Sequence, residues 1–275
     1  MADAGPKVSF VTVCYRTPNL VRQLLTGLEA ASLTFPFEYF VVDNGGDGTA
    51  DMVRERFPWA IVLEGHGNVG FGAGNNRAFR EAKGEYVMLV NPDLTVFPGE
   101  IERLVAFADA EPSAGLVGPR LVNPDRSVQR TFHRFPDSLI PLYRRTRLGR
   151  TPWGRRAVAN YLMEDADPSV VRDVDGLFGA AILIRRSALD AIGHFDERFF
   201  MYFEDVDLCR RAWEAGWRVV YAPVAEFVHY HQRESEVKHL WGAPLNRLAR
   251  AHIASGVKYF WKYRGKEHPR AVSGG

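Results

Sequence analysis

In the first 120 residues, stretches whose hydrophobic pattern is typical of buried strands alternate with stretches whose pattern is typical of amphipathic helices. Residues 8–15 (VSFVTVCY) form a β-branched and aromatic run that predicts a strand buried on both faces. Thr17 and Pro18 then supply an N-cap and a first-turn proline, and leucines follow at helical spacing. Further strands are expected at 39–42, 60–63, 86–90 and 115–122, and further helices at 50–57, 73–83 and 101–110.

Strands that alternate with helices in this way predict an α/β fold with a right-handed, doubly wound and mostly parallel sheet. In such sheets ligands bind beyond the carboxyl ends of the strands. Residues 136–172 break the pattern. They are rich in proline and arginine, which indicates a long connection with some helix, either a lid or a solvated basic surface. Beyond it we expect a strand at 177–185, helices at 187–192 and 204–215, a strand at 217–221, and an amphipathic basic helix at 244–264.

Composition narrows the class of protein. The 275 residues are 46% hydrophobic and 25% charged, which is ordinary for a globular protein, and a net charge of +2 is too small for a dedicated nucleic-acid binder. No apolar run is long enough for a transmembrane helix, and the N-terminus has no apolar signal core. Two cysteines are too few for a disulfide scaffold, so a cytoplasmic, reduced compartment is expected.

Polar residues follow the early predicted strands, at the edge where a doubly wound sheet binds its ligand. They are CYR at 14–16, DNGG at 43–46, Asn68, and NPD at 91–93. Each of these alone also suits a plain turn. A second Asn-Pro-Asp at 123–125 is expected to be no more than a turn.

The segment 67–76 (GNVGFGAGNN) invites comparison with a dinucleotide-binding fingerprint but fails it. Asn75 stands where the third glycine would be, and the segment follows the third strand rather than the first. Small residues before a helix still permit a pyrophosphate to approach backbone N–H groups. The segment therefore predicts phosphate proximity and excludes NAD.

Two later clusters carry candidate chemistry. Glu204, Asp205 and Asp207 follow an apolar run at the start of a predicted helix. They either stabilise the helix N-terminus or include a general base held beside an apolar wall. His229 and His231 follow an apolar strand, where histidine is more often structural, although imidazole also suits divalent transition metals.

Six motifs, taken in this order, resemble glycosyltransferase family 2, the inverting enzymes with the GT-A fold. They are VVDNGG, GNVGFGAGNN, YVMLVNPD, FGAAILIRR, FFMYFEDVDLCRR and VHYH, and the resemblance covers residues 7–232. It is closest to rhamnosyltransferase-like members that build bacterial cell-wall and O-antigen polysaccharides. It implies a GT-A domain at 1–243, with a Rossmann-like nucleotide-binding half at 7–122 and an acceptor and catalytic half at 123–243. A C-terminal basic helix and tail at 244–275 would follow.

The resemblance also implies roles for individual residues. Asp43 would bind the nucleotide base, flanked by the backbone near Val13 and Tyr15. The donor pocket would be lined by Asn68, Gly70, Asn75 and Asn91.

Asp93 would bind Mn²⁺ or Mg²⁺ at the diphosphate, and His229 would complete the metal shell. Asn91 replaces the first acid of the family's Asp-x-Asp motif, which predicts that the metal is recruited together with the nucleotide. Asp205 would be the catalytic base, and the acceptor side would be formed by Phe178, Gly179 and Glu204.

These roles predict a single displacement that inverts the anomeric centre, in which Asp205 deprotonates an acceptor hydroxyl and a nucleoside diphosphate leaves. The resemblance favours dTDP-L-rhamnose as the donor, with UDP-sugars open, and a cell-envelope glycan or lipid-linked acceptor. The alternatives are a sugar-nucleotide nucleotidyltransferase, whose usual Gly-rich basic N-terminal loop is missing here, and a non-catalytic nucleotide-sugar binder. The C-terminal helix predicts either peripheral attachment to the inner face of the cytoplasmic membrane or packing on the catalytic domain.

Overall fold

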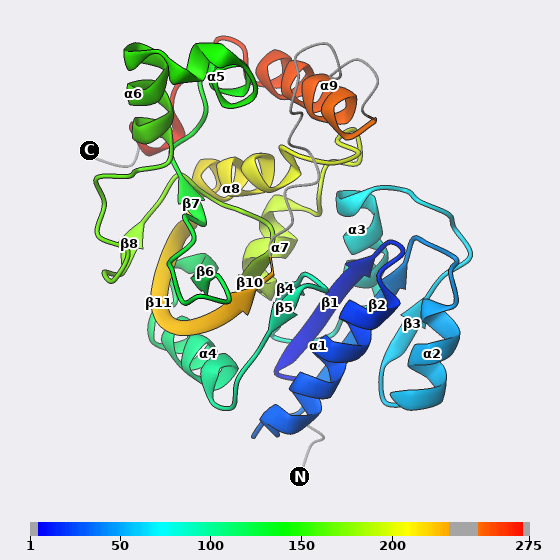
Figure 1. Cartoon of the computed structure of the whole chain (residues 1–275). Coiled ribbons are helices and arrows are strands. Elements are labelled where there is room, and N and C mark those ends of the chain that lie inside the picture. The colour runs from blue at the N-terminus through cyan, green and yellow to red at the C-terminus, as the bar shows by residue number, and fades with distance from the viewer. Residues whose placement is uncertain (1–4, 231–246, 272–275) are drawn as a thin grey trace.

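The computed structural model describes residues 5–230 and 247–271 of the chain (Figure 1). Parallel strands form its first half: β1 (Val8–Cys14), β2 (Phe37–Asp43), β3 (Ile61–Leu63) and β4 (Tyr86–Val90). β2 and β3 lie on one side of β1 and β4 lies on the other. The winding direction therefore reverses beside β1, and such a switch point is where doubly wound sheets bind ligands.

The sheet continues past β4 with strands from the second half of the chain. β10 (Ala181–Arg185) runs antiparallel between β4 and β6 (Ala114–Val122), and β11 (Arg218–His229) runs parallel to β6. Two short strands, β5 (Leu94–Thr95) and β8 (Arg172–Asp173), pair antiparallel with β11. Within the described residues, six of the nine strands of this sheet point the same way, so the predicted mostly parallel α/β sheet is confirmed.

The predicted strand at 177–185 is divided in two. β9 (Gly176–Leu177) pairs with β7 (Phe132–His133) in a separate small sheet, and the main sheet resumes only at β10. The chain turns between them because the N–H of Phe178 donates to Thr131 and the N–H of Gly179 donates to Asp205. A continuous apolar run in the sequence does not reveal this turn.

The predicted strand at 217–221 continues as far as His229. Its pairing with β6 is interrupted between Tyr221 and Glu226, a stretch that contains Pro223. Proline has no N–H to donate to the ladder, so the strand bends there and then pairs again. The extension carries His229 to the same edge of the sheet as the end of β4, because His229 pairs with Leu94.

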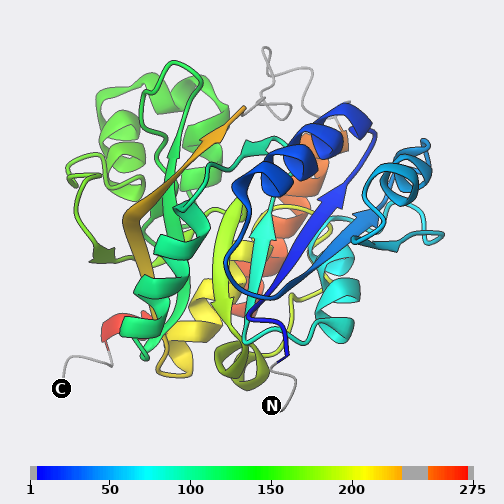
Figure 2. The same ribbon diagram turned by 90° about the horizontal axis from the view of Figure 1, so that it is seen from below.

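Helices cover both faces of the sheet, and Figure 2 shows β1, β4 and β10 side by side in the middle. One face packs against α1 (Pro18–Ala31), α2 (Thr49–Arg56) and α4 (Glu100–Ala110); the other packs against α3 (Phe71–Glu81), α7 (Arg186–Ile192) and α8 (Glu204–Glu214). Successive strand residues point to opposite faces. Phe10 and Met88 accordingly lie in one core and Val11 and Leu89 in the other, which explains the continuous apolar runs.

The proline- and arginine-rich region folds into short helices above the second half of the sheet. They are α5 (Ile140–Arg145), η1 (Arg147–Arg150) and α6 (Pro152–Tyr161). Thr151 caps α6 by accepting a hydrogen bond from the N–H of Gly154 at 3.1 Å. The arginines at 144, 147, 150, 155 and 156 are exposed, as a solvated basic surface requires.

The described chain ends with α9 (Arg247–Lys262) and the short η3 (Pro269–Ala271). The predicted helix at 244–264 is thus observed from 247, and residues 244–246 lie outside the described part. Among the described residues, no helix is long and apolar enough to cross a bilayer.

Candidate active site

The carboxyl ends of β1 and β2 meet the start of α3 at one edge of the sheet. Asp43 ends β2, and one of its oxygens accepts hydrogen bonds from the N–H groups of Gly45 at 2.7 Å and Gly46 at 3.2 Å. The other oxygen accepts from the N–H of Ala50 in the first turn of α2 at 3.3 Å. The Asp43 carboxylate therefore fixes the loop after β2. Tyr15, which follows β1, is exposed. The role of Asp43 in base binding stays a prediction.

Asn44 links this loop to the glycine-rich segment. Its side chain is buried, donates to the carbonyl of Gly70 at 3.0 Å and shares a 2.9 Å hydrogen bond with His66 Nε2. The sequence interpretation quoted Asn44 only as part of a motif and gave it no role. The available signal was an amide placed directly after an aspartate at a strand end.

The glycines before and within α3 allow protein atoms to come close. Gly70 has φ +91°, and an added Cβ would lie 2.1 Å from the carbonyl oxygen of Phe200. A Cβ at Gly74 would lie 2.9 Å from Val13 Cγ1. The sequence predicts that a pyrophosphate comes close to the backbone of this segment. At Gly70 and Gly74 the close space is instead filled by other protein atoms. Gly67, where an added Cβ would meet nothing within 4 Å, is the open position of the segment.

The two asparagines predicted to line the donor pocket both bond within this segment. Asn68 accepts a hydrogen bond from the N–H of Gly70 at 3.1 Å. Asn75 is buried in α3 and donates to the carbonyl of Phe71 at 2.9 Å. They shape the segment in this structure, and their contacts with a donor stay predictions.

Asp93 and His229 face one another beyond the end of β4. The Asp93 carboxylate lies 3.3 Å from His229 Nε2, and the N–H of Tyr230 donates to the Asp93 carbonyl at 2.9 Å. His229 is almost fully buried, whereas the Asp93 side chain keeps about a fifth of its surface exposed. The pair therefore combines an oxygen and a nitrogen ligand at a partly open position. His231, the other histidine of this cluster, lies outside the described residues.

Gln129 fixes which nitrogen of His229 faces Asp93. Its Nε2 donates to Asn123 at 2.7 Å and to the His229 carbonyl at 2.9 Å, so its Oε1 is the acceptor for His229 Nδ1 at 2.8 Å. With Nδ1 as a donor, Nε2 is left to face the carboxylate. Histidines that bind metals are oriented by a second hydrogen bond of this kind. The sequence interpretation gave Gln129 no role.

The second Asn-Pro-Asp is a turn, as predicted. Asp125 accepts hydrogen bonds from the N–H and hydroxyl of Ser127, at 3.0 and 2.5 Å, and Arg126 has φ +69°. Asn123 of this turn also contacts Gln129, so the turn supports the Asp93–His229 pair indirectly.

The residues around Asp93 fit a divalent cation that is shared with a ligand. In the described part of the chain, no group of three or more metal-ligating side chains occurs. The described residues thus offer one carboxylate and one imidazole at this position. Mn²⁺ and Mg²⁺ prefer six ligands with several oxygens, which water and a diphosphate would supply. This donor set agrees with the predicted recruitment of metal together with the nucleotide.

The turn at 178–180 lies between this pair and the acidic cluster. The N–H of Asn91 donates to the carbonyl of Ala180 at 2.9 Å, and the N–H of Gly179 donates to the Asp205 carboxylate at 3.0 Å. An added Cβ on Gly179 would lie 3.3 Å from the Phe71 ring and 3.6 Å from Asp205 Cβ. Gly179 is therefore the position where α3, α8 and the end of β4 converge.

Asp205 is presented by a strained start of α8. Tyr202 and Phe203 both have φ +69°, a conformation that bulky residues rarely adopt. Strain of this kind persists where surrounding contacts impose it and gathers at functional sites. The two oxygens of Asp205 accept from the N–H groups of Val206 at 2.8 Å and Gly179, which fixes the carboxylate.

The two neighbouring acids differ in environment. Burial raises the pKa of Asp205, and the N–H groups of Gly179 and Val206 oppose that rise. Burial, together with the charge of Asp205, raises the pKa of Glu204 to about 8. Glu204 is 5% exposed, and its Oε2 has no hydrogen-bond partner among the residues that the structure describes. At neutral pH Glu204 is therefore mostly protonated, and the role of Asp205 as the base of the pair stays a prediction.

Asp207 has a structural role. Its side chain is fully buried, bonds Arg211 on its own helix at 2.8 Å and pairs with Lys262 of α9. No described side chain caps the start of α8, so Asp207 has a structural role of another kind: it anchors α9.

Asp205 and Glu204 line a pocket of about 100 Å³. The other walls include Tyr161, Phe178 and, from α5, Arg144. The Arg144 guanidinium lies 5.6 Å from the centroid of the Tyr161 ring and 5.8 Å from that of Phe178. A carboxylate fixed by backbone N–H groups beside aromatic walls suits general-base chemistry on a hydroxyl-bearing ligand.

Comparison with known proteins identifies the family. The family model described as glycosyltransferase-like family 2 matches residues 6–251. The chain belongs to this family. It is 36% identical to the N-acetylglucosaminyl-diphospho-decaprenol L-rhamnosyltransferase of Mycobacterium tuberculosis, over 84% of this chain and 77% of that protein. It is 22% identical to rhamnosyltransferase WbbL of Escherichia coli, over 94% of both chains.

Solved structures show the same fold. The crystal structure of GalNAc-T7 with UDP, GalNAc and Mn²⁺ superposes with a TM-score of 0.64 at 12% identity, over 96% of this chain and 49% of that one. The predicted GT-A architecture is therefore confirmed. In this glycosyltransferase fold, the residues predicted to bind the donor lie around β1, β2 and α3, those predicted to bind a metal lie at Asp93 and His229, and those predicted for the acceptor side lie around Asp205.

Proposed function

We propose that this glycosyltransferase moves L-rhamnose from dTDP-L-rhamnose to a hydroxyl of a lipid-linked glycan, with inversion at the anomeric carbon. The observation that carries the proposal is the position of Asp205. Its carboxylate is fixed by two backbone N–H groups in a small pocket, across the 178–180 turn from the Asp93–His229 pair. A base and a leaving-group site on two sides of one turn suit a single displacement.

On the acceptor side, Asp205 takes the proton of the attacking hydroxyl. The oxygen forms its bond to the anomeric carbon as the bond from that carbon to the diphosphate oxygen breaks, and the electron pair leaves with the diphosphate. Burial raises the pKa of Asp205, which makes it a stronger base than an exposed aspartate. Glu204 remains protonated beside it, so it adds no second negative charge to the pocket.

On the donor side, Asp93 and His229 would hold Mn²⁺ or Mg²⁺, which neutralises charge that develops on the leaving diphosphate. Support comes from the geometry of the pair and from Gln129, which orients the imidazole. GalNAc-T7, which shares the fold, binds Mn²⁺ together with UDP. We propose that Gln129 belongs to the functional site as a positioning residue.

The substrates are proposed from the relatives. The mycobacterial relative carries L-rhamnosyltransferase and N-acetylglucosaminyl-diphospho-decaprenol in its name, and this chain covers most of its length. We therefore propose an N-acetylglucosaminyl-diphospho-polyprenol acceptor. Family membership favours a transferase over the nucleotidyltransferase considered from the sequence. Action at the inner face of the cytoplasmic membrane stays a prediction.

A transfer assay tests the proposal. Purified protein is incubated with Mn²⁺, a short-chain N-acetylglucosaminyl-diphospho-lipid, and either dTDP-L-rhamnose or a UDP-sugar. We expect a rhamnosylated product whose anomeric configuration is opposite to that of the donor. The same donor should raise the melting temperature in the presence of Mn²⁺, because a ligand that binds only the native state stabilises it. If product forms only from a UDP-sugar, the proposed donor is wrong. Donor binding without turnover would favour the non-catalytic alternative.

A further inference from the structure

Helix α9 turns one side toward the protein, and that side is well packed. Ser255 and Tyr259 are buried, and Tyr259 packs against Phe203. The hydroxyl of Ser255 donates to the carbonyl of Met201 at 2.9 Å. Gly256 permits the approach, since an added Cβ would lie 3.3 Å from the Phe203 ring. The apolar contacts between α9 and the rest of the described chain therefore involve only this side of the helix.

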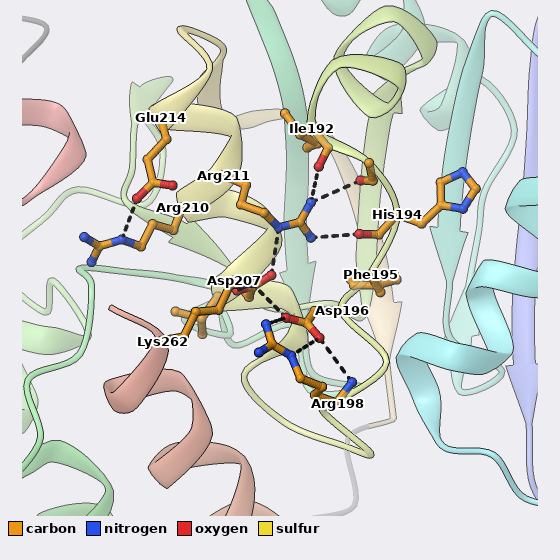
Figure 3. A network of polar contacts seen from close by, with 12 residues as sticks. Ile192, His194, Phe195, Asp196, Arg198, Asp207, Arg210, Arg211, Glu214 and Lys262 are labelled. Atoms are coloured by element: carbon orange, nitrogen blue, oxygen red, sulfur yellow. Dashed lines mark hydrogen bonds and ion pairs between the residues drawn. The ribbon is translucent and has the colours of Figure 1, made fainter. Parts of the chain in front are cut away.

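Charged contacts fix the orientation of α9 (Figure 3). Lys262 pairs with Asp196 and Asp207, and Arg211 bonds the other oxygen of Asp207. The hydroxyl of Tyr263 also donates to Asp207, at 2.8 Å. Asp207 is fully buried, so a rotation of α9 would remove two of the three polar partners of a carboxylate in the interior and leave only Arg211. These contacts keep the opposite side of α9 turned toward solvent.

That outer side carries an apolar stripe, formed by Ile253, Val257 and Trp261. Their exposed fractions are 56%, 65% and 74%. Residues four apart lie above one another on a helix, so the three side chains are aligned. A single exposed apolar residue is ordinary, whereas an aligned group on a fixed helix marks an interaction surface.

Basic residues surround the apolar stripe. Arg250, Lys258 and Arg264 are exposed, and the Arg264 guanidinium lies 5.9 Å from the centroid of the Trp261 ring. Residues 247–266 contain no aspartate or glutamate. Apolar residues flanked by cations are typical of helices that lie in the headgroup region of an anionic bilayer. A second copy of this chain fits less well, because its cations would meet these cations.

The position of α9 relates this surface to the acceptor pocket. Figure 1 shows α5, α6 and α9 at the same end of the molecule. The pocket that contains Asp205 is lined by Ile140 and Arg144 of α5 and by His252 of α9. α5, η1 and α6 add exposed apolar residues of their own, namely Leu142, Leu148 and Trp153. Basic elements with exposed apolar residues therefore flank the pocket.

We infer that the outer face of α9 docks on the surface of an anionic bilayer, with the apolar stripe among the headgroups and the basic side chains against lipid phosphates. The inference rests on the proposed function, because a lipid-linked acceptor stays in the same bilayer and presents its sugar to the pocket beside α9. Docking confines enzyme and acceptor to one surface and so raises their effective concentration.

Vesicle flotation tests the inference. The full chain is mixed with vesicles of phosphatidylcholine alone or with one-third phosphatidylglycerol, at low and high salt. We expect flotation with the anionic vesicles, weakened by salt. The double variant Val257→Glu/Trp261→Glu should lower the bound fraction by at least ~10-fold, since it removes apolar contact and adds repulsion. Val170→Glu, at another exposed valine outside α9, is the matched control and should float like the wild type.

Three outcomes would overturn the inference. They are no flotation of the wild type with anionic vesicles, equal flotation of the double variant, or a wild-type dimer in sedimentation that the double variant abolishes. Transfer to a water-soluble acceptor analogue separates this inference from the proposed function. Soluble transfer without flotation rejects the docking surface alone, and flotation without transfer rejects the proposed function alone.

Discussion

Asp205 and Glu204 are adjacent in sequence, but the pocket gives them different environments. Asp205 is fixed by two N–H groups and has a raised pKa, whereas Glu204 is buried without a partner for one oxygen. Asp205→Asn should lower turnover by at least ~100-fold, because it removes a positioned base, and should leave donor binding nearly unchanged. Steady-state kinetics and calorimetry measure the two effects. Glu204→Gln is the control; wild-type turnover in Asp205→Asn with loss in Glu204→Gln would reverse the assignment.

Asp93 and Asp125 provide a matched pair of acids within identical tripeptides. Asp93 faces His229, whereas Asp125 bonds Ser127 within its own turn. Asp93→Ala should abolish the part of donor binding that depends on Mn²⁺, and Asp125→Ala should retain it. Titration calorimetry with donor, with and without Mn²⁺, measures this. Equal losses in both variants would show that Asp93 is not the ligand.

The raised pKa of Glu204 predicts a pH dependence of stability. In the folded protein Glu204 titrates at about 8, near Asp205 and Asp207, with Arg144 of α5 and His252 of α9 also at the pocket. Above pH ~4.5 the unfolded chain ionises this group and the folded protein does not, so Glu204 increasingly favours unfolding up to pH ~8. Below pH ~4.5 both states are protonated and the effect vanishes.

Glu204→Gln should therefore become more stable relative to the wild type as the pH rises from 5 to 8. For each pH unit in which Glu204 is ionised in the unfolded chain but protonated in the folded protein, the free energy of unfolding changes by about 1.4 kcal/mol. This corresponds to a change in melting temperature of roughly 2–4 °C in a domain of this size. Melting curves of both proteins across this pH range provide the measurement. A constant difference in melting temperature would show that Glu204 is ionised in the folded protein.

At the scale of elements, the start of α3 depends on one glycine. Gly70 combines φ +91° with a position where a Cβ would lie 2.1 Å from the Phe200 carbonyl, while Gly67 has φ +64° and open space. Gly70→Ala should cost roughly 2–5 kcal/mol, the sum of backbone strain and overpacking, and should weaken donor binding, because α3 must move away from the 199–203 segment. Gly67→Ala should cost only the ~1–2 kcal/mol of a left-handed alanine. Denaturant unfolding compares the two, and equal losses would refute the packing explanation.

At the scale of the molecule, α9 belongs to the folded unit. It supplies Lys262 and Tyr263 to the buried Asp207, and Tyr259 to the cluster around Phe203. A chain that ends at residue 246 keeps the Arg211–Asp207 pair but loses the contacts of Lys262 and Tyr263 with Asp207 and the packing of Tyr259, which together should cost roughly 3–5 kcal/mol. Its melting temperature should fall by at least ~6 °C, whereas Val257→Glu on the outer face should keep the wild-type value. An unchanged melting temperature in the shortened chain would show that α9 does not contribute to the stability of the domain.

The sequence by itself determined the sheet and the order of the motifs. Continuous apolar runs and apolar residues at helical spacing are local properties of a sequence. The strands at 8–15 and 86–90 and the helix after Pro18 were therefore predicted within a residue or two. It also selected Asp205 over the other two acids, although only through the family resemblance. The second Asn-Pro-Asp was correctly predicted as a turn, because turn chemistry is local as well.

Only the tertiary structure decided which residues meet. β10 inserts between β4 and β6, and this insertion brings Gly179 to Asp205 and Ala180 to Asn91. Gln129 lies a hundred residues from His229 in sequence, so no local pattern could reveal their hydrogen bond. The same holds for Asp207 and Lys262: the charges are evident in the sequence, but their pairing and the outward face of α9 follow from packing.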